Sequence, residues 1–241
     1  HGEAQAVGNL GNVYKKMKDW QRATELYGQA LIIFRDIGDR WSEGAALINL
    51  GNAYQAQGEI PYLIDYFDQA LVLYRQIGSQ WGEGMALDSL GPAYAHSGEL
   101  TKAVECYEQA LKLYRETGNR HKEAAILGNL SNAWGEAGEL TRSIEYGQQC
   151  LQIYREVDDH AGARIALSNL GLNYGEMGEM QRALEYYEQA LLIAREIGDT
   201  FEEQAAKATA AGKRRDAEKA LEQAQQWREW AEAAEGAVSQ L

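Results

Sequence analysis

The 241-residue chain has little cysteine, little proline and a shortage of basic residues. Two cysteines cannot build a disulfide framework, which we interpret as a sign of a reducing, cytoplasmic location. Lys and Arg total 23 against 36 Asp and Glu, a formal net charge of −13, so the basic footprint needed for nucleic-acid binding is missing. No apolar run approaches the ~20 residues of a membrane-spanning helix, and we therefore expect no membrane partner.

Glycine is abundant, with 25 residues against only 2 prolines, a combination that suits both loops and long helices. A repeat of 40 residues explains this combination of many glycines and few prolines. One column holds leucine throughout, the next holds glycine except at Ser131, and an aromatic residue follows three positions later. These columns are Leu10, Leu50, Leu90, Leu130 and Leu170; Gly11, Gly51, Gly91 and Gly171; and Tyr14, Tyr54, Tyr94, Trp134 and Tyr174. Self-similarity at a fixed period indicates a repeat architecture.

Each repeat predicts two helices joined by a glycine turn. In the second repeat, apolar residues at helical spacing predict helices over 41–56 and 61–77, with Gly58 between them. Between repeats, a glycine suited to a left-handed C-cap precedes a residue suited to an N-cap. These pairs are Gly38-Asp39, Gly78-Ser79, Gly118-Asn119 and Gly198-Asp199. The chain is therefore predicted to be all-α.

The spacing Leu-Gly-x-x-Tyr, then Ala-x-x-x-aromatic, then Ala resembles the tetratricopeptide repeat family over residues 1 to about 200. The 40-residue unit is similar to that of Pins-like scaffolds, kinesin light chains and bacterial multi-repeat proteins. The resemblance implies a right-handed α-solenoid of antiparallel helix-turn-helix units. We expect one domain with units at about 1–37, 38–77, 78–117, 118–157 and 158–197, then a shortened sixth unit and capping helix over 198–241.

The sixth unit is predicted from echoes of the fifth that lie 34 residues later, such as Gly178 and Gly212. Its first helix is expected near 200–211 and its second near 214–235, where a solvated helix would cap the array. At the other end, His1-Gly2 enters a helical pattern without a start signal, so we expect the chain to be part of a longer protein.

Groups that carry chemistry are scarce. The four histidines and two cysteines show no zinc-ligand spacing, and Cys150 fills a small-residue column as a structural thiol would. Carboxylates are spread over faces expected to be exposed, without the isolated pair in an apolar pocket that acid–base catalysis needs. We predict no catalytic activity, no metal and no cofactor.

The resemblance implies that the first helix of each unit lines a concave groove that binds peptides. The positions that map to this groove are Asn9, Asn12, Asn49, Asn52, Asn129, Asn132 and Asn169. Asparagine offers a donor and an acceptor to a peptide backbone, so such a ladder can hold an extended chain. The alternative is that these side chains only bridge neighbouring helices.

Other groove positions are acidic or small. Asp88, Glu136 and Glu176 would make the groove negative, and Gly8, Gly128, Gly135 and Gly175 would leave it wide. We therefore expect a basic or amphipathic segment as partner, against the alternative of neutral drift in a stable array. Pro92 predicts a kink in its helix, because proline removes one backbone hydrogen bond. Trp41 and Trp81 are interpreted as packing residues rather than ligand anchors.

The leading functional interpretation is a non-catalytic protein-interaction module that binds a peptide or helical segment. A second is a ligand-sensing region of a larger bacterial signalling protein, linked to an ATPase switch or an effector. A third is a structural solenoid that self-associates end to end.

Overall fold

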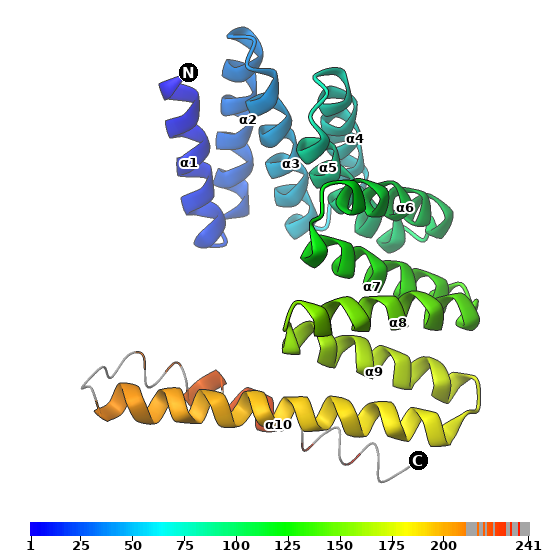
Figure 1. Ribbon diagram of the computed structural model, residues 1–241. Coiled ribbons are helices and arrows are strands. Elements are labelled where there is room, and N and C mark those ends of the chain that lie inside the picture. The colour runs from blue at the N-terminus through cyan, green and yellow to red at the C-terminus, as the bar shows by residue number, and fades with distance from the viewer. Residues whose placement is uncertain are drawn as a thin grey trace. The chain divides into compact units, whose positions relative to one another are not determined.

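In the computed structural model, ten helices follow one another along residues 1–210 (Figure 1). The structure describes these residues and, beyond them, residues 216, 219, 221–223, 225–229, 232 and 236. The helices are α1 (Gly2–Lys16), α2 (Trp20–Asp36), α3 (Arg40–Gln57), α4 (Ile60–Gln76), α5 (Gln80–His96), α6 (Leu100–Glu116), α7 (Arg120–Glu136), α8 (Leu140–Glu156), α9 (His160–Glu176) and α10 (Met180–Ala210). The prediction of an all-α chain is confirmed.

Short turns set where the helices begin and end. Asp39 caps α3, because its side chain accepts a hydrogen bond from the backbone N–H of Ser42. Ser79 and Asp159 cap α5 and α9 in the same way. The turn glycines have positive φ, the left-handed region that favours glycine: Gly38, Gly58, Gly78, Gly98, Gly118, Gly138 and Gly178. The predicted glycine turns are therefore confirmed at these seven positions.

The chain divides into two compact units, His1–Asn119 with α1–α6 and Arg120–Leu241 with α7–α10. Within each unit, every helix packs against its neighbours in sequence. The core consists of the repeat columns: Leu50, Leu90, Leu130 and Leu170 are all buried. Within each unit, burial of these columns holds the hairpins together and aligns the first helices of successive repeats.

The glycine column lets an aromatic ring lie directly on the backbone. A Cβ at Gly51 would lie 2.3 Å from Cε1 of Phe67, and one at Gly91 would lie 2.2 Å from Cε1 of Tyr107. No real side chain tolerates such distances, so the rings require glycine there. The helices of each hairpin can therefore approach closely.

In the fourth repeat, the two helices pack together without a ring lying on a glycine. Ser131 replaces the column glycine, and Gly147 on α8 replaces the aromatic residue. Ser131 Oγ donates to the carbonyl of Ser143 at 2.8 Å, and Ser143 Oγ donates to the carbonyl of Ser131 at 2.7 Å. Asn173 Nδ2 then donates to Ser143 Oγ at 2.7 Å. Hydrogen bonds thus join α7, α8 and α9 where other repeats use a ring.

The predicted turn at Gly198-Asp199 is wrong, because α10 runs through both residues as one helix to Ala210. The expected first helix of the sixth unit is a continuation of α10. Residues 199–210 are rich in Ala, Glu and Gln, which favour helix, and lack the Leu-Gly pair that packs a hairpin closed elsewhere. The sequence of this segment therefore favours continuation of the helix over a turn.

The predicted second helix near 214–235 lies partly outside the described residues. Residues 225–229 are helical, and Trp227 packs against Leu191 and Ala194 of α10. Pro92 lies inside α5, which continues through it without interruption. Among the described residues, no helix has the length and apolar character required to cross a membrane.

Candidate functional site

Seven of the ten predicted groove residues are gathered in two places, one in each compact unit. The 40-residue register brings the twelfth residue of one repeat next to the ninth residue of the following repeat. Asn12 of α1 therefore lies near Asn49 of α3, and Asn132 of α7 lies near Asn169 of α9. Each pair lines a pocket.

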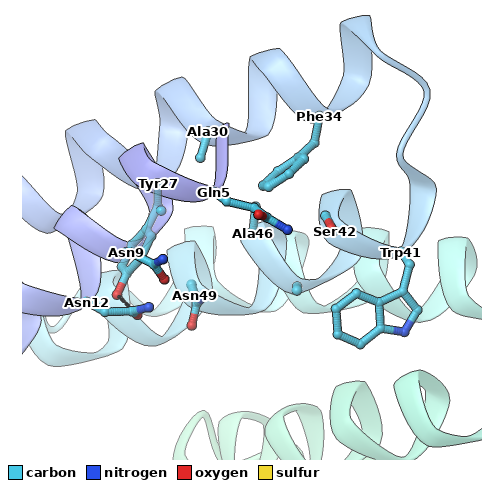
Figure 2. A pocket seen from close by; sticks show the side chains of 12 residues that line it. Gln5, Asn9, Asn12, Tyr27, Ala30, Phe34, Trp41, Ser42, Ala46 and Asn49 are labelled. Atoms are coloured by element: carbon cyan, nitrogen blue, oxygen red, sulfur yellow. Dashed lines mark hydrogen bonds between the residues drawn. The ribbon is translucent and has the colours of Figure 1, made fainter. Parts of the chain in front are cut away.

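The first pocket has a volume of about 420 Å³ and is formed by α1, α2 and α3. Asn9, Asn12 and Asn49 lie together at one end of it, and Trp41 lies at the other (Figure 2). Gln5 and Phe34 also contribute to its wall (Figure 2). We name this site the amide–tryptophan pocket.

Asn12 is held in place by the core, because the hydroxyl of Tyr27 donates to its Oδ1 at 2.8 Å (Figure 2). This bond engages one lone pair of Oδ1 and does not involve the Nδ2 donors. Burial raises the pKa of Tyr27, so its hydroxyl remains a donor at neutral pH. Tyr27 therefore fixes the orientation in which Asn12 presents its amide.

Trp41 lies at the surface and packs against another tryptophan. Its side chain is 46% exposed and stacks on Trp81 of α5, which is 60% exposed. The ring centroids are 5.8 Å apart, with an interplanar angle of 18°. The two rings extend the pocket wall as an exposed aromatic surface, a feature that the 40-residue spacing of the two tryptophans could have indicated.

The second pocket, of about 230 Å³, lies between α7 and α9 and is lined by Asn132, Asn169, Glu136 and Glu176. Asn169 Nδ2 donates to Asn132 Oδ1 at 2.8 Å, so these two amides do bridge neighbouring helices. Glu136 and Glu176 are exposed and form no ion pair with any residue that the structure describes. We name this site the acidic pocket.

Three predicted residues lie outside both pockets. Asn52 on α3 and Asn129 on α7 are partly exposed and line neither pocket. Asp88 on α5 lies against Tyr114 of α6: burial raises the pKa of Tyr114, and the Asp88 carboxylate raises it further. Asp88 is thus engaged within its own hairpin.

The groove glycines are also divided. Gly8 lines the amide–tryptophan pocket and Gly135 lines the acidic pocket. Gly128 and Gly175 line neither and instead face the second helix of their hairpins, where a Cβ would lie 3.4 Å from Cys150 Sγ and 3.9 Å from Ala183 Cβ.

The thiols are not activated for chemistry. Burial raises the pKa of Cys106 to about 11 and that of Cys150 to about 12, so both are protonated at neutral pH. Among the described residues, no group of three or more His, Cys, Asp or Glu side chains could hold a metal ion. The arrangement of both pockets suits hydrogen bonding and stacking rather than covalent chemistry.

Comparison with known proteins points to one family. The tetratricopeptide repeat matches residues 2–76, 43–116 and 122–196. No protein of curated function matches the chain in sequence. Among the solved structures that share the fold are the following three, all below 25% identity.

A putative kinesin light chain repeat protein from Podosopora anserina is 22% identical, with a TM-score of 0.69 over 79% of this chain and 94% of that one. A signal transduction ATPase with a tetratricopeptide repeat sensor, from Pyrococcus horikoshii, is 17% identical, with a TM-score of 0.75 over 96% of this chain and 38% of that one. A Rap protein complexed with Competence and Sporulation Factor is 14% identical, with a TM-score of 0.64 over 96% of this chain and 76% of that one.

Proposed function

Because the chain belongs to the tetratricopeptide repeat family, we propose that it is a non-catalytic, cytoplasmic interaction module that holds a peptide or helical segment against the first helices of its repeats. The amide–tryptophan pocket is the observation that carries this proposal. Its three asparagines offer donors and acceptors to a peptide backbone, and Trp41 with Trp81 offers an apolar surface to a side chain.

The acidic pocket supports a basic or amphipathic ligand. Glu136 and Glu176 have the same position in successive repeats and are not neutralised by any described residue. A Lys or Arg side chain between them would form charge-assisted hydrogen bonds with both carboxylates. Because both are exposed, the gain is expected to depend on ionic strength.

The first test uses peptides selected from a random display library against the whole chain. Asn9→Ala combined with Asn49→Ala removes pocket amides and should weaken binding by about tenfold or more, since each lost hydrogen bond contributes about 0.5–1.5 kcal/mol. Asn52→Ala, on the same helix as Asn49 but outside the pocket, is the matched control. Equal affinities of all three proteins would refute peptide binding at this pocket.

The second test concerns charge. Glu136→Lys with Glu176→Lys should abolish the salt-dependent part of the affinity for basic peptides. The same reversals at Glu145 and Glu188, which are exposed and line neither pocket, change the net charge equally and serve as control. If both double variants weaken binding alike, the effect belongs to net charge and not to the acidic pocket.

A second candidate function is sensing within a larger signalling protein. The Pyrococcus horikoshii ATPase, whose repeat region is described as a sensor, aligns with nearly the whole of this chain. Sequencing the gene beyond both ends of the chain tests this candidate, because an adjoining ATPase or effector domain is required. Light scattering over a concentration series separates both candidates from a self-associating solenoid, which alone predicts a mass that rises with concentration.

A further inference from the structure

A column of arginines near the ends of the second helices is held by internal partners in the first unit. Arg35 Nε donates to Glu43 Oε1 at 2.9 Å, and its Nη2 donates to Gln69 Oε1 at 3.2 Å. Arg75 repeats the arrangement with Glu83 at 2.7 Å and Gln109 at 2.6 Å. Each guanidinium thus bonds a carboxylate eight residues later and an amide 34 residues later.

Arg155 has the same position in the fourth repeat but lacks the carboxylate. Its Nη2 donates to Gln189 Oε1 at 2.9 Å, so the amide partner is kept. The residue eight positions later is Ala163, which is buried and has no polar side chain. Among the described residues, no carboxylate pairs with Arg155. In the first unit, the Nε of the equivalent arginines donates to a glutamate. The Nε of Arg155 therefore retains the capacity to donate to a carboxylate.

Arg155 lines a groove between α8 and α10, two helices that lie on either side of α9 (Figure 1). The groove has a volume of about 610 Å³, and a second pocket of about 490 Å³ adjoins it and shares Gln148, Leu151, Arg155 and Tyr186. Neither pocket shares a residue with the amide–tryptophan or acidic pocket. We name this surface the α8–α10 groove.

Arg182 supplies a second cation to the same groove. It lies over Tyr174, with its Cζ 5.4 Å from the ring centroid, and pairs with Glu179 at 2.8 Å. Tyr174 stacks on Tyr186 with ring centroids 5.2 Å apart, and both rings line the groove. Glu185 is the carboxylate that lines the larger pocket, and Glu156, in the smaller pocket, is bonded by Arg120.

We propose that the α8–α10 groove binds a carboxylate side chain from an acidic segment of a partner protein, with Arg155 as its main ligand. The guanidinium fork matches a carboxylate with two parallel hydrogen bonds. A carboxylate is also the group that Arg35 and Arg75, at equivalent positions, already bind. The site is independent of the peptide pockets and has the opposite charge preference to the acidic pocket.

The test follows the Nε–Hε resonance of Arg155 in whole protein labelled with ¹⁵N-arginine, assigned by its loss in Arg155→Gln. The probe is an eight-residue peptide of alternating Glu and Ala, and the same peptide with Gln in place of Glu is its control. The acidic peptide should shift the Arg155 resonance in a saturable manner, and the Gln peptide should not. Equal responses to both peptides would overturn the proposal.

Ala163→Glu supplies the missing internal carboxylate. It should weaken binding of the acidic peptide by about tenfold or more, because the peptide then competes with an intramolecular partner. Ala163→Gln adds nearly the same volume without charge and should retain binding. The converse variant, Glu83→Ala, frees Arg75 and should create a second responsive arginine. Thermal melts confirm that each variant is folded, and unchanged affinity in folded Ala163→Glu would refute the role of Arg155.

Inorganic phosphate and acetate distinguish a side chain of a partner from a free anion. The proposal expects both to compete only at concentrations at least tenfold above that of the acidic peptide, since the peptide brings several carboxylates to one groove. Phosphate that competes at concentrations equal to those of the peptide would overturn the assignment to a partner segment.

Discussion

At the scale of single residues, glycines inside helices have two opposite roles. A Cβ at Gly91 would meet Cε1 of Tyr107 at 2.2 Å, whereas a Cβ at Gly175 would lie 3.9 Å from the nearest atom outside its own helix, Ala183 Cβ. We therefore expect Gly91→Ala to destabilise the protein by about 1–3 kcal/mol through overpacking. Gly175→Ala should stabilise it by about 0.5–1 kcal/mol through reduced chain entropy. Urea denaturation measures both, and a loss of stability in Gly175→Ala would show that this glycine is needed for more than space.

Single residues of the two pockets also show where prediction of the site from sequence succeeds and where it fails. The register places Asn9, Asn12 and Asn49 together, and they do line one pocket. Sequence spacing does not reveal that Asn169 donates to Asn132, because an amide can turn toward a neighbour or toward a ligand at nearly equal cost. The sequence predicts that Trp41 packs but does not show how exposed it is. A tryptophan at the start of a helix can be buried or stacked on another exposed ring, and only the tertiary arrangement decides.

At the scale of the element, the fourth hairpin shows two substitutions that depend on each other. Gly147 leaves a space that Ser131 Oγ and Leu170 approach, at 3.1 and 3.0 Å from the position of a Cβ. Gly147→Tyr alone should therefore cost about 1–3 kcal/mol. Adding Ser131→Gly restores the residue pair of the other repeats, and we expect a favourable coupling energy of about 0.5–3 kcal/mol in a double-mutant cycle.

Ser131→Ala is the matched control for this cycle. It removes the hydroxyl but keeps the Cβ, and the glycine column shows that the Cβ is what the ring cannot tolerate. Relief by Ser131→Ala as large as that by Ser131→Gly would contradict this assignment and show that Ser131 Oγ, rather than its Cβ, obstructs the ring.

Helices were predictable from sequence wherever a packed column supports them. The turns at Gly38 and Gly78 follow the pattern because each joins two helices of one unit that pack against each other and bury leucines. Gly198 has the same local sequence but no positive φ, since the residues after it lack such a column. A turn glycine permits a reversal, and the tertiary packing on both sides determines whether the reversal occurs.

At the scale of the whole molecule, stability should be distributed rather than global. Within each unit, helices pack against their sequence neighbours, with added contacts between α3 and α5 and between α7 and α9. In such arrays a perturbation acts mainly on adjacent repeats. Gly91→Ala displaces Tyr107, which joins α5 to α6, so local opening should become easier around these helices.

Hydrogen–deuterium exchange with mass spectrometry tests this expectation in the intact chain. Exchange in Gly91→Ala should accelerate in peptides from α3–α6, by a factor that corresponds to the loss of stability, about tenfold for each 1.4 kcal/mol. Peptides from α8–α10 should exchange as in the unaltered protein, because they belong to the other compact unit. Gly147→Tyr provides the converse measurement, with acceleration in α7–α9 and none in α1–α4. Equal acceleration along the whole chain in both variants would instead mean that the two units unfold as one cooperative body, and the acidic pocket and the amide–tryptophan pocket would then be energetically coupled.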